Sequence, residues 1–314
     1  MLRSMYSGIS GLRANQTKLD VIGNNIANVG TTAFKSQRVR FQDMLSQSMK
    51  EGTGAGNTVG GTNPSQVGLG TQIAGIDTTV TQGNMQPTSN NLDFAIDGDG
   101  YFVVERGPVS GTGASTYFTR DGSFTLDEFG QLLTSDGYRV MGYQIDGSTI
   151  DYSKGAPKID KAKNVNDTTP VVATSTKVPL AIPDEVGGQK VKSFSVDKNG
   201  LINATLADNN VVALGQIAMV SFKNPAGLLK EGKNLYSVSP NSGGALFRDG
   251  VGTDPKTSNE KSFGDINQGM LEMSNVDLAE QFTEMIVASR AFQANGKMIT
   301  TGDEILQELV NLKR

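Results

Sequence analysis

The chain has 314 residues, 37% of them hydrophobic, with 38 glycines and a formal net charge of −4 at pH 7. This size is sufficient for a folded core in one to three domains, and the high glycine content predicts many turns. The absence of cysteine, histidine and tryptophan excludes disulfides, Cys/His zinc sites and a histidine general base. The acidic total gives no indication of partners among nucleic acids or anionic membranes.

The N-terminal segment is predicted to be helical. Apolar side chains recur every seven residues, which predicts a heptad-type helix from about residue 3 to 27. The residues of this row are Met5, Leu12, Leu19 and Ile26. The opening "MLRSMYSGISGLRANQ" lacks the apolar core of a cleaved secretory signal, and no run of apolar residues is long enough for a transmembrane helix.

The middle of the chain is predicted to consist of strands and turns. Residues 46–70 are rich in Gly, Ser, Thr and Asn without periodicity, so we expect a loop and a domain boundary near residue 70. Alternating apolar residues and Asp-Gly or Asn-Gly pairs predict hairpins in 71–145 and about 188–240, and 241–270 is expected to be a second linker. The polar stretch 146–187 is expected to be a small insertion or outer subdomain.

The C-terminal segment mirrors the first helix. "SNVD" at 274–277 supplies Ser274 or Asn275 as an N-cap, which predicts a helix from about 276 to 312. Its apolar row consists of Leu278, Met285, Phe292, Ile299 and Leu306, flanked by Phe282 and Val310. The two rows could pair with each other inside one chain or with neighbouring subunits, and a pair with so narrow an apolar row buries little on its own.

The two ends of the chain also carry opposite charge. Residues 1–50 contain seven Lys/Arg and two Asp/Glu, whereas 271–314 contain four Lys/Arg and seven Asp/Glu. The ends therefore either attract one another or form two separately solvated faces.

Sequence motifs for catalysis or for metal and phosphate binding are weak or absent. "DGDGY" at 97–101 fails the EF-hand spacing, and the Gly-rich run 52–61 lacks a phosphate-loop pattern. Paired carboxylates such as Asp127 and Glu128 fit solvated turns better than a catalytic site. We therefore predict no catalytic residue, no metal and no cofactor, and we expect that the chain is not an enzyme.

The segment "GNNIANVGTTAFK" after the first helix is rich in residues that end helices. Asn24 and Asn25 are expected to bond the last helical carbonyls or to fix one packing register. Asn28 and Gly30 tolerate the left-handed turn that closes many helices, and Phe34 is expected to anchor the exit.

This segment, with both ends of the chain, resembles the bacterial flagellar axial family of rod and hook proteins. The family pattern "NNIANxxTxGFK" is matched by Asn24, Asn25, Ile26, Ala27, Asn28, Thr31, Phe34 and Lys35. Ala33 stands where the family usually has glycine, which argues against a positive φ there. "LDFAIDGDGYFVV", "NPAGL" and the closing helix also resemble the family, over about 85% of the chain; only residues 146–187 fall outside the resemblance.

The resemblance implies an α+β fold, with terminal heptad-type helices paired as a coiled-coil layer and a central antiparallel β-rich domain. The inner axial domain would combine 1–70 with 271–314, and the β-rich domain would combine 71–145 with 188–270. It also implies a structural subunit that self-assembles into a hollow helical tube. The residues expected at the subunit interface are Met5, Leu12, Leu19, Asn24, Asn25, Ile26, Asn28, Phe34, Leu278, Phe282, Met285, Phe292, Ile299 and Leu306.

Within the family, the resemblance favours the flagellar hook, a tube that transmits motor torque, and leaves the distal rod as the alternative. A secreted β-rich enzyme or binding module is the remaining alternative. Partners implied by the resemblance are copies of the chain, neighbouring rod proteins, hook-filament junction proteins, the hook cap and the flagellar type III export apparatus. The implied location is the flagellum, outside the cell envelope, after export without a cleaved signal.

Overall fold

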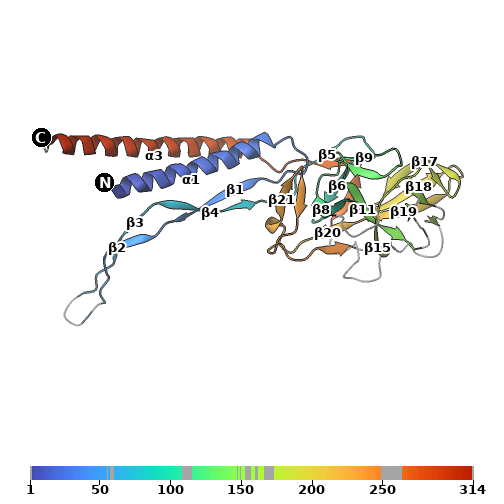
Figure 1. The fold of residues 1–314 in the computed structure, drawn as a ribbon, viewed down its shortest axis with the longest axis horizontal. Helices are drawn as coiled ribbons and strands as arrows, with labels where there is room; N and C mark the ends of the chain where they lie inside the picture. The colour runs from blue at the N-terminus through green and yellow to red at the C-terminus, as the bar shows by residue number, and fades with distance from the viewer. Residues whose placement is uncertain are drawn as a thin grey trace. The chain divides into compact units, whose positions relative to one another are not determined.

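The computed structural model describes residues 2–54, 56, 60–107, 115–146, 148, 150–152, 157–159, 162–165, 173–248 and 264–312. The chain divides into two compact units, which are described separately (Figure 1). The helical unit comprises Met1–Gly30, Lys35–Thr79 and Val276–Arg314. The β-rich unit comprises Thr31–Phe34 and Val80–Asn275.

Two long helices run antiparallel in the helical unit. Helix α1 spans Leu2–Ala27 and helix α3 spans Leu278–Leu312, which confirms the two predicted terminal helices. The N-cap of α3 is Asp277, whose carboxylate Oδ1 accepts a hydrogen bond from the Ala279 amide at 2.8 Å. The prediction of Ser274 or Asn275 as the cap was wrong, because the first free amides of the helix lie within reach of Asp277 instead.

A long antiparallel hairpin completes the helical unit. Strand β1 (Gln37–Asp43) pairs with β4 (Thr71–Thr78), and β2 (Ser46–Lys50) pairs with β3 (Ser65–Gly68). The prediction of a loop over 46–70 was therefore wrong for the residues of β2 and β3, whereas the described residues between these strands belong to no strand. All residues of β2 and β3 are exposed, so this hairpin carries no apolar alternation from which a strand can be predicted.

The β-rich unit contains one closed, largely antiparallel barrel and two short ladders. In the ladders, β5 (Met85–Pro87) pairs with β25 (Met270–Glu272) and β6 (Phe94–Asp97) pairs with β24 (Asp265–Gln268). The barrel strands are β7 (Tyr101–Arg106), β8 (Ser115–Thr119), β9 (Phe124–Leu126), β10 (Leu132–Thr134), β11 (Arg139–Ile145), β12 (Ile150–Asp151), β13 (Lys158–Ile159), β14 (Lys163–Asn164), β15 (Ala173–Pro179), β16 (Glu185–Val186), β17 (Gln189–Val196), β18 (Leu201–Leu206), β19 (Val211–Ile217), β20 (Met219–Ser221), β21 (Leu229–Gly232), β22 (Leu235–Ser237) and β23 (Leu246–Arg248).

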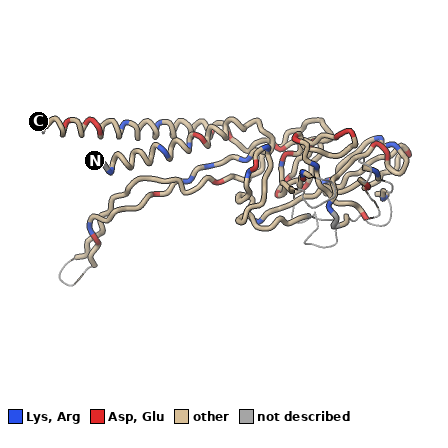
Figure 2. The backbone as a smooth tube through the Cα atoms, viewed as in Figure 1, with Lys and Arg blue, Asp and Glu red and all other residues tan. Residues whose placement is uncertain are grey.

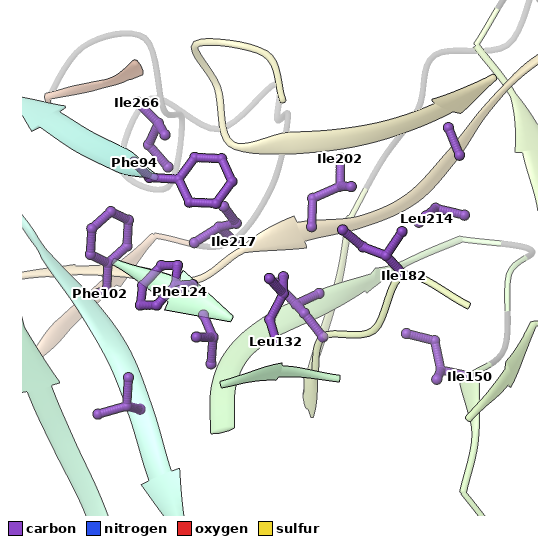
Figure 3. Packing of buried hydrophobic residues seen from close by; sticks show 14 of the residues in the cluster. Phe94, Phe102, Phe124, Leu132, Ile150, Ile182, Ile202, Leu214, Ile217 and Ile266 are labelled. Carbon is purple, nitrogen blue, oxygen red and sulfur yellow. The ribbon is translucent and has the colours of Figure 1, made fainter. Parts of the chain in front are cut away.

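Alternation along β7 divides the core into two clusters. Phe102 and Val104 point into the larger cluster, whereas Tyr101 and Val103 point into the smaller one, and all four side chains are buried. Figure 3 shows Phe94, Phe102 and Phe124 together in the larger cluster. The ring of Phe124 lies 5.9 Å from that of Phe94 and 5.2 Å from that of Phe102, which is typical of packed aromatic rings.

The predicted turns are partly confirmed. Asp136-Gly137 joins the paired strands β10 and β11, and Asn199-Gly200 joins β17 and β18. The Asp-Gly turn at 97–100 does not form a hairpin, because β6 pairs with β24 whereas β7 pairs with β8, β11 and β20. Instead, Gly98 and Gly100 have φ of 114° and 148°, which glycine adopts readily, and the chain passes here from the β6–β24 ladder into the barrel. The turn predicted at Asp146-Gly147 lies partly outside the described residues.

The units differ from the predicted domain boundaries at several places. Thr31–Phe34 and residues 271–275 belong to the β-rich unit and not to the helical one. Strands β23 and β24 lie in the stretch 241–270, which was expected to be a linker. Residues 71–78 belong to the helical unit, because β4 pairs with β1. The described strands within 146–187 pair with the barrel, since β14 pairs with β19 and β15 pairs with β11. These described residues therefore form part of the barrel and not a separate outer subdomain.

Candidate assembly surfaces

Glycines on one face of α1 allow α3 to approach closely. A Cβ atom placed on Gly8 would lie 3.4 Å from Ile299, and one placed on Gly11 would lie 2.7 Å from the side-chain nitrogen of Asn295. Near the other end of the pair, Lys18 Nζ lies 3.4 Å from a Glu284 carboxylate oxygen. Small residues therefore set the helix separation where larger side chains would hold the helices apart.

The predicted apolar rows fall on two kinds of surface. The whole row of α1 is half-buried in the helical unit: Met5, Leu12, Leu19 and Ile26. Met285, Ile299 and Leu306 of α3 are also half-buried, on the face turned to α1.

Three predicted interface residues of α3 are instead exposed. Leu278 is 40% exposed, Phe282 is 49% exposed and Phe292 is 40% exposed. These side chains, unlike the half-buried row, are available for contact with another molecule. Ile286 and Val287 add to this uncovered apolar surface at 61% and 60%.

The asparagine cluster has a different arrangement from the expected one. Asn25 is fully buried, and its amide group donates to the Gln37 carbonyl at 2.7 Å and to the Gln281 side chain at 3.0 Å. The side-chain oxygen of Asn25 accepts a hydrogen bond from the backbone amide of Gln37 at 3.0 Å. Asn25 therefore ties α1 to the starts of β1 and α3 within one chain.

Asn28 caps the end of α1 through its side chain. The amide group of Asn28 donates to the Asn24 carbonyl at 2.9 Å, and Asn24 itself is exposed. The expected left-handed turn at Asn28 or Gly30 is absent, because neither of these two described residues has a positive φ. The positive φ falls on Ala33, at 56°, so the expectation against it was wrong.

Ala33 adopts this conformation because its surroundings fix the backbone. Its side chain is only 2% exposed, and its amide donates to the Glu272 carbonyl at 2.8 Å. Next to it, Phe34 is half-buried, with Lys230 Nζ 4.9 Å from the ring centroid. The exit segment that ends in Phe34 is thus held in the β-rich unit by the Ala33 amide and by the contact between Lys230 and the Phe34 ring. The predicted hydrophobic contact of Phe34 with a neighbouring subunit stays a prediction.

A buried ion pair in the β-rich unit was not predicted. Arg120 Nε lies 2.9 Å from Glu272 Oε2, and the two side chains are 3% and 0% exposed. Arg120 also donates to the Gly98 carbonyl at 2.6 Å, and Glu272 Oε1 accepts from the Gly83 amide at 3.0 Å. The residues are 152 positions apart, so no local spacing pattern marks them.

Two tyrosines beside this pair have shifted pKa values. Burial raises the pKa of Tyr236 to about 12, with Arg120 opposing the shift and Glu272 reinforcing it. Burial also raises the pKa of Tyr101, whose ring lies 5.6 Å from that of Tyr236. Both groups are therefore neutral at physiological pH.

Two other kinds of site are absent from the part of the chain that the structure describes. Within those residues, no group of three or more Asp or Glu side chains is placed to hold a metal ion. Among the same residues, neither helix has a stretch apolar and long enough to span a lipid bilayer.

Family models match both ends and the middle of the chain. The model described as flagella basal body rod protein matches residues 5–35, and that of the flagellar hook protein FlgE/F/G D1 domain matches 95–204. The flagellar basal body rod FlgEFG protein C-terminal model matches 267–312.

Full-length relatives decide the family. The flagellar basal-body rod protein FlgG of Bacillus subtilis is 46% identical over 314 residues, which cover 100% of both chains. The chain belongs to the flagellar rod and hook protein family. The resemblance stated from the sequence is therefore confirmed, as is the predicted fold class: a helix at each end of the chain and a β-rich domain between them in the sequence.

Other members of the rod and hook family align over different lengths. In Borreliella burgdorferi, the rod protein FlgG is 34% identical over 316 residues and the hook protein FlgE is 29% identical over 455 residues, both with full coverage of each chain. A crystal structure of Helicobacter pylori flagellar hook protein FlgE2 superposes with a TM-score of 0.39 and 11% identity, covering 60% of this chain and 100% of that one.

Membership establishes the general role. Proteins of the rod and hook family are structural parts of the flagellum and form polymers within its basal body and axial structure. This chain is accordingly a flagellar axial structural protein, and the exposed apolar side chains of α3 are its candidate assembly surface.

Proposed function

We propose that this chain is a distal rod subunit of the flagellar basal body, polymerising with copies of itself. The observation that carries the proposal is the 46% identity to a rod protein of matching length, over 314 residues. The hook relatives instead align over 455 and 477 residues, so they contain long segments that this chain lacks. The comparisons thus favour the rod alternative over the hook interpretation that sequence analysis preferred.

The physical basis of polymerisation is the apolar surface left open on α3. Side chains such as Phe282, Ile286 and Val287 are 49% to 61% exposed in the single chain, and burying them against a neighbour is favourable. Neighbouring rod and hook proteins would contact the two ends of such a polymer. Export through the flagellar type III apparatus is part of the same proposal.

Deletion of the gene tests the proposal. In the native bacterium, electron microscopy of detergent-extracted flagellar bodies should show bodies without a complete rod, and therefore without a hook. Re-expression of the chain should restore both structures. Bodies with a complete rod that lack only the hook would overturn the rod proposal and support the hook.

A further inference from the structure

A groove lies on the face of α1 that α3 does not cover. It has a volume of about 590 Å³ and lies between α1 and the β1–β4 side of the hairpin, within the helical unit. Its apolar lining includes Tyr6, Ile9, Met44 and Ile73, and Tyr6 is 68% exposed. At 100° per residue, its α1 lining lies on the opposite side of the helix from Gly8, Gly11 and Leu19.

The groove is also basic. Arg3 and Arg13 are among its lining residues, and the described residues of the lining include no acidic side chain. An occupant that fits both properties would be apolar along one stripe and acidic beside it, because unlike charges at the rim of an apolar contact favour the correct partner.

The C-terminal half of α3 combines an apolar stripe with acidic side chains beside it. An apolar stripe about 60° wide is formed, at 100° per residue, by four side chains that do not face α1. They are Met298, Ile305, Leu309 and Leu312, which are 51%, 48%, 48% and 83% exposed. Glu304 and Glu308 lie beside the stripe, and Figure 2 shows acidic residues in this part of α3.

The lengths of the two surfaces also agree. The α1 lining runs from Arg3 to Thr17, and the stripe runs from Met298 to Leu312. Each covers 14 residue steps, or about 21 Å of helix at a rise of about 1.5 Å per residue. One helix segment could therefore fill the groove from end to end.

We propose that the groove between α1 and the hairpin binds the Met298–Leu312 segment of α3 from a second copy of this chain. The inference rests on the proposed polymer of identical subunits. The groove and the stripe are different surfaces of one chain, so the contact is head-to-tail and can continue from subunit to subunit. A self-complementary patch would instead close into a dimer.

Disulfide trapping tests the contact directly, because the natural chain contains no cysteine. Two differently tagged full-length chains are co-expressed in the deletion strain, one with Ile9→Cys and the other with Ile305→Cys, and the extracted flagellar bodies are oxidised. Ile9 and Ile305 lie near the middle of the two surfaces. A disulfide needs Cα atoms within about 7 Å, so a band containing both tags is expected. The matched control replaces Ile305→Cys by Gln307→Cys, which is two residues away on the opposite side of α3, and should give only background.

Charge exchange provides an independent readout. Arg13→Glu should reduce incorporation into flagellar bodies, and adding Glu308→Arg to the same chain should restore it. Incorporation of both cysteine variants without a mixed-tag band above the control would overturn the inference, as would a charge exchange with no restoration. A mixed-tag band in bodies whose label lies along the hook would instead overturn the rod proposal and leave this contact standing.

Discussion

Glu272 connects separate segments of the β-rich unit at the residue scale. Its carboxylate binds Arg120 and the Gly83 amide, and its backbone carbonyl accepts from the Ala33 amide. Because both charges of the pair are buried, each depends on the other for compensation. The segment that precedes β1 is thus tied to the segment that precedes α3 by contacts within this unit.

Glu272→Gln should destabilise the β-rich unit strongly. The change leaves the Arg120 charge buried without its counter-charge, which costs about 3–5 kcal/mol. Urea unfolding followed by circular dichroism measures this loss. The control is Asp136→Asn, which breaks the solvent-exposed pair with Lys233 and should cause a much smaller loss of stability. Equal losses for the two variants would show that burial does not govern the Arg120 pair.

Tyr236 should make folding sensitive to alkaline pH. Its pKa is raised from 10.0 to about 12 in the folded protein, so the unfolded chain releases this proton first as pH rises. The stability from neutral Tyr236 is complete below pH 10 and is lost as pH rises through about 12. Tyr236→Phe should therefore show a smaller loss of unfolding free energy from pH 9 to pH 11.5 than the wild type. Parallel curves for the two proteins would contradict this assignment.

At the scale of elements, the close contact of α1 and α3 rests on specific glycines. Gly11 faces Asn295 so closely that an added methyl group would displace the Asn295 side chain, whereas a Cβ atom placed on Gly23 of the same helix would meet no atom within 4 Å. The two glycines are otherwise both interior positions of α1. Replacing each glycine by alanine therefore distinguishes the effect of helix propensity on stability from the effect of packing against α3.

Gly23→Ala should raise the stability of the helical unit by about 0.5–1 kcal/mol, because alanine is the better helix former. Gly11→Ala should gain nothing or lose stability, because the same propensity gain is offset by the clash with Asn295. Thermal unfolding monitored at 222 nm compares the two variants. An equal gain for both would mean that Gly11 does not set the helix separation.

The same elements show what the sequence can and cannot predict. The heptad rows predict α1 and α3 because a repeated apolar face is a local property. The β2–β3 hairpin has no such signal, since its residues are all exposed and its register follows from continuing β1 and β4. The partner of β6 lies about 170 residues away, so the Asp-Gly pair at 97–98 suggested a local hairpin that does not form.

Single residues were likewise predictable where a local pattern marks them and unpredictable where their role depends on contacts between distant segments. The half-buried apolar row of α1 was predicted from its seven-residue spacing, which is a local property. The positive φ of Ala33 and the Arg120–Glu272 pair were not predicted, because both depend on contacts between distant segments of the β-rich unit. Asn25 was recognised, but only the structure gives its partners, Gln37 and Gln281.

At the scale of the whole molecule, assembly should depend on side chains that the single chain leaves exposed. Phe292→Asp should leave the β-rich unit folded, because Phe292 lies on α3 in the helical unit. The variant should nevertheless fail to enter the flagellar axial structure, since a charge would be buried at the interface. Immunoblotting of extracted flagellar bodies measures incorporation.

Gln293→Asp is the matched control, because it places the same charge one residue further along on an exposed polar position of α3. It should be incorporated like the wild type. Normal incorporation of Phe292→Asp would show that this part of α3 does not contact a neighbour.

The location of the chain in the flagellum tests the central claim most directly. Immunogold electron microscopy of detergent-extracted flagellar bodies, with an antibody against residues 146–187, assigns the chain to one segment of the axial structure. The account predicts label confined to the straight rod. Label along the curved hook outside the cell envelope would contradict it.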